Sequence, residues 1–116
     1  MKRFISLFPV FTFMISTAFG QNIRFAEYDL PNGLKVILHE DHSTPIVAVS
    51  VMYHVGSKNE KPNRTGFAHF FEHLLFEGSE NIKRGEFDDY INNAGGSNNA
   101  NTTYDRTFYY EVLPSN

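Results

Sequence analysis

The sequence predicts an α+β protein, in which a mixed or antiparallel sheet carries its helices on one face. Three observations predict this class. Short segments rich in β-branched and aromatic residues occur near both ends of the chain, two amphipathic helical patterns lie between them, and turns rich in Gly, Asn and Pro separate the segments. The expected order is three strands, two helices and two strands.

The first three strands are expected before residue 56. Residues 23–30 and 34–40 read as two strands that flank Pro31-Asn32-Gly33, a turn signal because Asn and Gly tolerate positive φ. The segment 46–55, "IVAVSVMYHV", is apolar on both faces at its start, which favours a central strand.

Two helices are expected after a loop that is rich in helix breakers. The first covers about 65–77, with Asn63 or Thr65 as its N-cap and Gly78 at its C′ position. The second covers about 86–94 and ends at Gly95. Its apolar stripe consists of Phe87, Tyr90, Ile91 and Ala94. Residues 97–105 then lead into a strand at 106–114 that is rich in aromatic residues and threonine.

The first helix has two chemically different faces. At about 100° per residue, an apolar stripe forms on one side, where we expect it to face the core. His69, Glu72 and His73 fall on the opposite side, together with Phe76, which is placed to floor a pocket or pack against another layer. The apolar stripe comprises Phe67, Phe70, Phe71, Leu74 and Leu75.

The polar face of this helix has the chemistry of a metal site. Residues at i and i+4 are neighbours, so the imidazoles of His69 and His73 can converge on one ion, and Glu72 lies beside it as a candidate general base. The pattern His-x-x-Glu-His on a helix is an inverted zinc-peptidase motif. The plainer interpretation is a solvated face with two ordinary histidines. We interpret the remaining histidines, His39, His42 and His54, as structural.

The motif does not stand alone, because four segments together resemble the insulinase/pitrilysin (M16) family of zinc metallopeptidases, in particular its exported bacterial members. These segments are "PNGLKVIL", "VGSKNE", "RTGFAHFFEHLLFEGSEN" and "GGSNNANTTYDRTFYYEVLP", in the order in which the family has them. The resemblance covers about residues 25–114. It implies the first part of the first domain of a half-chamber, so we expect residues 21–116 to be a partial peptidase domain.

The resemblance implies a role for individual residues. His69 and His73 match the two zinc-binding histidines, and Glu72 matches the general base that acts on a zinc-activated water. The third zinc ligand of the family, a glutamate, would lie beyond Asn116. The segment formed by Asn99, Ala100, Asn101 and Thr102 matches the strand that pairs with the substrate backbone. A polar edge strand beside a cleft is suited to that role, although a plain loop or hairpin strand is the alternative.

The implied activity is zinc-dependent endopeptidase hydrolysis of extended oligopeptides, in a chamber completed by a second homologous half or subunit. With one ligand missing, we expect the 116 residues by themselves to bind zinc weakly and to hydrolyse peptides poorly or not at all. Two alternatives remain at this point: a non-catalytic partner subunit, and a small exported metal-binding module. The intact motif argues against a non-catalytic subunit, and a simple metal-binding module would leave the presence of Glu72 unexplained.

The remaining features indicate where the protein is located and which kinds of site and partner are excluded. Residues 1–20 begin with Lys2 and Arg3, continue with an apolar run and end in small residues, which is typical of a signal peptide and not of a stable membrane anchor. We therefore expect an exported protein, periplasmic or extracellular. The 116-residue chain has no cysteine, which excludes disulfides and thiolate metal sites, and its net charge of −3 with no basic stripe argues against nucleic acid as a partner.

Overall fold

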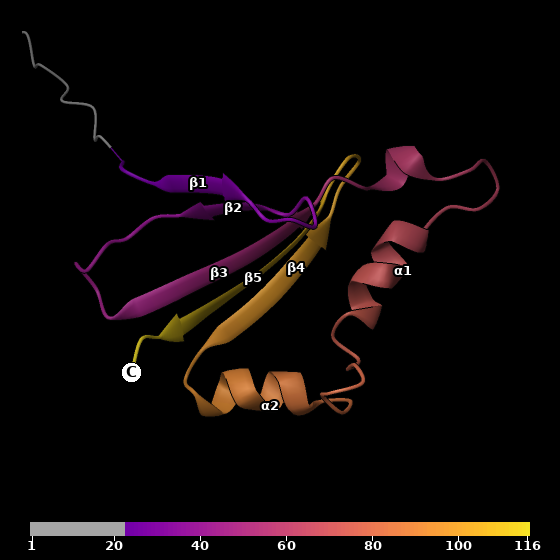
Figure 1. The fold of residues 1–116 in the computed structure, drawn as a ribbon. Helices are drawn as coiled ribbons and strands as arrows, with labels where there is room; N and C mark the ends of the chain where they lie inside the picture. Colours follow the sequence, from indigo (N-terminus) through magenta and orange to yellow (C-terminus); the bar gives the residue numbers. More distant parts are fainter. Residues whose placement is uncertain (1–22) are drawn as a thin grey trace, which may run out of the picture. The chain divides into compact units, whose positions relative to one another are not determined.

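The computed structural model describes residues 23–116, so the predicted signal peptide at residues 1–20 lies outside the described part of the chain. Two compact units are distinguished; the first ends at Glu40 and the second is Asp41–Asn116. No helix within residues 23–116 has the length and the apolar character needed to cross a membrane. The elements are β1 (Ala26–Asp29), β2 (Lys35–Leu38), β3 (Ile46–Tyr53), the 3₁₀ helix η1 (Ser57–Asn59), α1 (Phe67–Leu74), α2 (Glu86–Asn93), β4 (Ser97–Thr102) and β5 (Thr107–Pro114) (Figure 1).

The first unit contains an antiparallel hairpin of β1 and β2, with the turn that the sequence predicts. Gly33 has a φ of 83°, and its N–H donates to the carbonyl of Leu30 at 2.8 Å. The Asn32 side chain accepts from the N–H of Leu34 at 3.1 Å. In this tight turn, Gly33 therefore supplies the positive φ and Asn32 supplies the side-chain acceptor, as these residue types favour.

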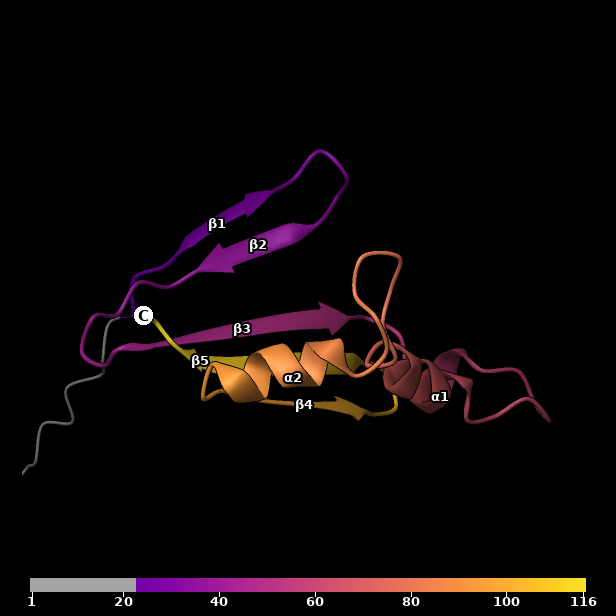
Figure 2. The same ribbon diagram turned by 90° about the horizontal axis from the view of Figure 1, so that it is seen from below.

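The second unit is built on a three-stranded antiparallel sheet with the order β3-β5-β4 (Figure 2). The prediction of a central strand at 46–55 is wrong for this sheet, because β5 occupies the centre and β3 is an edge. An apolar composition marks a strand that can be buried, but strand order depends on which distant segments pair. Here β3 and β4 both pair with β5, the aromatic-rich last strand.

Both helices lie against the same face of this sheet, as the sequence predicts. On α2, Asp88 accepts a hydrogen bond from the Asn98 side chain at 2.9 Å, and on α1, Glu72 accepts one from Thr102. Asn98 and Thr102 are four residues apart on β4, so their side chains leave the same face of the strand. The fold is thus the α+β class that the sequence predicts, with helices on one face.

A small core lies between this face and the helices. Ile91 of α2 is 7% exposed and Tyr109 of β5 is 9% exposed. The ring of Phe76 lies 5.9 Å from the ring of Tyr109 and 6.2 Å from the ring of Phe87. Phe76 therefore packs against another layer, one of its two predicted uses. The predicted stripe of α2 is correct for Ile91 and for the partly buried Phe87, but Tyr90 is 61% exposed and Ala94 is also exposed.

The start of α1 differs from the prediction. The helix begins at Phe67 after Gly66, whose φ is 92°, so neither Asn63 nor Thr65 is its N-cap. It ends at Leu74, and Gly78 instead shapes a later turn. Local cap motifs do not identify the cap of this helix, because its first N–H groups donate to Glu60, six residues before Gly66.

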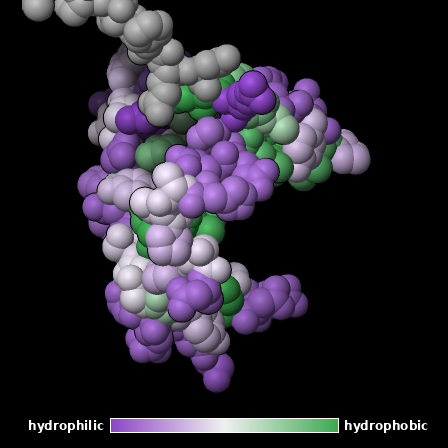
Figure 3. Space-filling model, turned by 90° about the vertical axis from the view of Figure 1, so that its left-hand side faces the viewer, coloured by the Kyte–Doolittle hydropathy of each residue, from purple (hydrophilic) through white to green (hydrophobic). Residues whose placement is uncertain are grey.

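The apolar stripe of α1 is not buried among the described residues, contrary to the prediction. Phe67, Phe70 and Phe71 are 51%, 56% and 59% exposed, whereas Glu72 on the opposite face is 8% exposed. A helical wheel separates two faces but does not say which one meets the sheet. On the left-hand side of the molecule as Figure 1 draws it, which Figure 3 turns toward the viewer, other hydrophobic residues also reach the surface between hydrophilic ones.

Candidate active site

The residues His69 and His73 come together on the polar face of α1. Their Nε2 atoms lie 3.1 Å apart, and their ring centroids are separated by 4.8 Å. This closeness follows from the i, i+4 spacing on a helix of eight residues. At this distance one imidazole can donate a hydrogen bond to the other, and both nitrogens can also face one ion.

The two histidines fit two of the ligand positions of a zinc ion. Two nitrogens bound at ~2.05 Å to a tetrahedral zinc would be separated by about 3.3 Å, close to the 3.1 Å between these Nε2 atoms. No third His, Cys, Asp or Glu joins them within residues 23–116. The described residues therefore supply part of a zinc site and not all of one.

Glu72 points away from solvent, toward the sheet. Its carboxylate accepts a hydrogen bond from the Oγ1 atom of Thr102 on β4. Burial, followed by the negative charge of Glu72, raises the pKa of the Tyr109 phenol, so this ring lies within electrostatic range of the same carboxylate. Glu72 thus sits at the junction of α1 and the sheet, adjacent in sequence to His73.

The predicted substrate strand forms β4, which is an edge of the sheet among the described strands. Its four predicted residues divide between the two faces of the strand. Ala100 and Thr102 belong to the face that meets Glu72, and Asn99 and Asn101 belong to the other. The Asn99 side-chain oxygen accepts from the N–H of Ala100 at 2.8 Å, and the Asn101 side-chain oxygen is buried without a hydrogen-bond partner.

A polar cleft separates α1 from β4. Its volume is about 730 Å³. It brings together, from both elements, His69, Glu72, Ala100, Asn101 and Thr102. Three of the four predicted substrate residues and two of the three motif residues therefore line one cavity, although they are about thirty residues apart in the chain.

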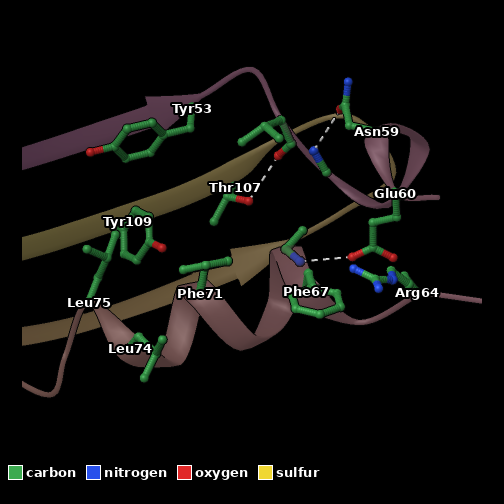
Figure 4. Close-up of a pocket in the computed structure, with 13 residues that line it drawn as sticks. Tyr53, Asn59, Glu60, Arg64, Phe67, Phe71, Leu74, Leu75, Thr107 and Tyr109 are labelled. Carbon is green, nitrogen blue, oxygen red and sulfur yellow. Dashed lines mark hydrogen bonds between the residues drawn. The ribbon is translucent and has the colours of Figure 1, made fainter.

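A second cavity, of about 450 Å³, lies on the other side of α1 (Figure 4). We call it the apolar groove, because its walls include Tyr53, Phe67, Phe71, Leu75 and Tyr109. Of the residues predicted for chemistry, none lines it. It lies between the apolar side of α1 and residues of β3 and β5.

Two residues in the site region have roles that sequence reasoning did not identify. Thr102 belongs to the predicted substrate strand, and its hydroxyl in addition donates a hydrogen bond to Glu72. Glu60 caps α1, with its two carboxylate oxygens accepting from the N–H groups of Gly66 and Ala68 at 2.8 Å each. The first contact joins residues 30 apart, which no local pattern reveals. For the second, an acidic residue shortly before the start of the helix was the available signal.

The chain is similar in sequence to peptidases from several organisms. Residues 35–116 match the family model described as insulinase, peptidase family M16. The chain is 43% identical over 82 residues to the zinc protease PqqE of Helicobacter pylori, covering 70% of this chain and 18% of that protein. It is 37% identical over 83 residues to human insulin-degrading enzyme, covering 71% of this chain and 8% of the enzyme.

A solved structure, the crystal structure of a protease from Helicobacter pylori, matches with a TM-score of 0.76 and 36% sequence identity. The match covers 79% of this chain and 22% of that one. The chain thus spans less than a quarter of the length of each of these relatives. The family model covers well over half of the chain, including both helices and β3 to β5. The chain therefore belongs to the insulinase family of peptidases, family M16.

Proposed function

We propose that this chain provides the histidine pair, the general base and the substrate strand of a zinc-dependent endopeptidase that cleaves extended oligopeptides. The observation that carries the proposal is the convergence of the His69 and His73 Nε2 atoms to 3.1 Å, with Glu72 one residue away beside a cleft. The named relatives support the same class of activity, since one is a zinc protease and another an insulin-degrading enzyme.

In this proposal His69 and His73 would hold zinc through their Nε2 atoms, and a third protein ligand would come from outside residues 23–116. When bound, zinc acts as a Lewis acid that polarises a carbonyl and activates water. Neutral imidazoles are required, because a protonated Nε2 has no lone pair to offer. The existing contact between the two rings would therefore be replaced by contacts to the ion.

Glu72 would move the protons of the reaction. Its carboxylate takes a proton from the attacking water and delivers it to the nitrogen of the leaving amine, the two tasks of a general base and then a general acid. The hydrogen bond from Thr102 fixes one side of this carboxylate, leaving the other for water. Because Glu72 is only 8% exposed, its charge is poorly screened by bulk solvent.

The edge of β4 would bind the peptide. An extended chain adds to a free strand edge through main-chain hydrogen bonds, so the contact is tolerant of sequence. Asn99 already occupies the N–H of Ala100, so a bound peptide must displace that side chain to reach this donor.

The proposal has two further parts. The protein would be exported to the periplasm or extracellular space, and a second homologous half or subunit would complete the chamber.

The test is peptide hydrolysis by the protein as its own cell makes it, assayed with an internally quenched oligopeptide. Glu72→Gln should reduce kcat at least ~100-fold, as expected for loss of a general base, with bound zinc unchanged by elemental analysis. Glu80→Gln, the same change at an exposed glutamate of the same unit, should retain full activity. Full activity in Glu72→Gln would refute the proposal.

A further inference from the structure

Polar contacts attach the helix that carries the motif to β4 and to the segment before it. Its large apolar residues are exposed, and Glu72 is its buried residue. The burial of apolar area along α1 is therefore only partial in the described unit. Two hydrogen-bonded attachments are available as well: Thr102 to Glu72 in the second turn, and Glu60 at the helix start.

The geometry at the helix start is that of a cap supplied from a distance. The first N–H groups of an α-helix lack acceptors within the helix, and Gly66 at the N-cap has no side chain to provide one. Glu60 provides two: its Oε2 accepts from the N–H of Gly66 and its Oε1 from the N–H of Ala68, both at 2.8 Å. Figure 4 shows the second of these bonds. A carboxylate here also interacts favourably with the positive end of the helix dipole.

The segment that carries Glu60 is itself fixed to the loop between β4 and β5. In η1, the N–H of Ser57 donates to the carbonyl of Thr103 at 3.1 Å, and that of Lys58 donates to the carbonyl of Tyr104 at 2.7 Å. Gly56 packs so closely against this loop that a Cβ would clash with its backbone. Glu60 therefore links the start of α1 to the end of the strand that contains Thr102.

We propose that Glu60 is a positioning residue for the active site: by capping α1 from the loop anchored to β4, it sets where His69 and Glu72 lie relative to the substrate strand. This inference rests on the proposed function. His69 is three residues beyond the Gly66 N-cap, within the first turn, where the loss of a cap has its largest effect. Backbone hydrogen bonds from Ala68 and Gly66 hold the pKa of the Glu60 carboxyl below its ordinary value, in keeping with a charged cap.

The test compares the wild-type protein, as its own cell makes it, with Glu60→Gln. Glutamine keeps the shape but offers one acceptor oxygen where the carboxylate offers two. Glu86→Gln is the matched control, because Glu86 accepts the N–H of Lys83 at 2.9 Å at the start of the other helix. Two readouts are followed by NMR: the affinity for zinc ion alone, and the imidazole signals of His69 and His73 in the metal-free protein.

We expect Glu60→Gln to weaken zinc binding roughly fivefold, the size of a typical lost cap, and to shift the His69 signals before any metal is added. Glu86→Gln should change neither. Unchanged affinity and signals in Glu60→Gln would overturn the inference while leaving the proposed function intact. A shift of the His69 signals in a protein that binds no zinc at all would support the positioning role and remove the proposed function.

Circular dichroism shows whether Glu60→Gln folds. If it does not fold, a second variant, Glu60→Asp, keeps the inference testable. Glu60→Asp keeps both acceptor oxygens and the charge, and we expect it to fold and to bind zinc within about threefold of wild type. If Glu60→Asp also fails to fold, Glu60 is needed for the fold as a whole and the positioning role is wrong. Zinc affinity restored by aspartate but not by glutamine would support it.

Discussion

The hydroxyl of Thr102 on β4 donates a hydrogen bond to the carboxylate of Glu72 on α1. This contact joins the strand proposed to bind substrate to the residue proposed to move protons. It also shields the carboxylate from solvent, since Glu72 is 8% exposed. Strand and helix are therefore coupled at the point where the chemistry is expected.

Removing this hydroxyl should destabilise the fold. Thr102→Val keeps the shape of the side chain but leaves a buried carboxylate without its donor, which costs about 1–3 kcal/mol. Thr102→Ser keeps the donor and should lie close to wild type. Urea unfolding followed by circular dichroism measures both, and equal stability of the valine and serine variants would show that the bond contributes nothing.

The exposed face of α1 predicts an unusual ranking of apolar substitutions. Ile91→Ala, at a residue 7% exposed, should lower the free energy of unfolding by about 2–4 kcal/mol. Phe70→Ala removes a larger side chain but one that is 56% exposed, so we expect less than about 1 kcal/mol. The same urea titration decides: a larger loss for Phe70→Ala than for Ile91→Ala would mean that the apolar stripe is buried after all.

The cap at Glu60 predicts a pH dependence of stability with a definite sign. The pKa of its carboxyl is lowered from the ordinary value of 4.5 by hydrogen bonds to the backbone of Ala68 and then Gly66. A lowered folded-state pKa means that the stabilisation is present above pH 4.5 and is lost as the pH falls through the folded-state pKa.

Acid titrations of wild type and Glu60→Gln measure this effect. The stability difference between the two should be constant at neutral pH and should shrink as the pH falls below 4.5, where wild type loses its charged cap. Glu86→Gln serves again as the reference for an unrelated helix start. A difference that grows on acidification has the wrong sign for a capping carboxylate.

The features that the sequence predicts correctly depend on residues that are close together in the chain. The order of elements was predictable because each signal is local: the aromatic and threonine content of 106–114, the Asn32-Gly33 turn, and the 3.6-residue period around Ile91. The pairing of His69 with His73 was predictable for the same reason, since the spacing on one helix sets it.

The features that were missed depend on distant parts of the chain. The position of β3 at a sheet edge follows from the pairing of β5 with two strands that are far apart in sequence. The orientation of α1 places Glu72 against Thr102, a contact between residues 30 apart in the chain. The cap by Glu60 comes from six residues before the N-cap, beyond the reach of local capping motifs.

The central claim is that His69 and His73 hold a zinc ion together, and a zinc titration of the protein as its own cell makes it tests this claim most directly. Isothermal titration should show about one zinc per chain, with His69→Ala and His73→Ala each weakening it at least ~10-fold and His54→Ala leaving it unchanged. Zinc binding that survives in both His69→Ala and His73→Ala would contradict the claim, because the ion would then sit elsewhere.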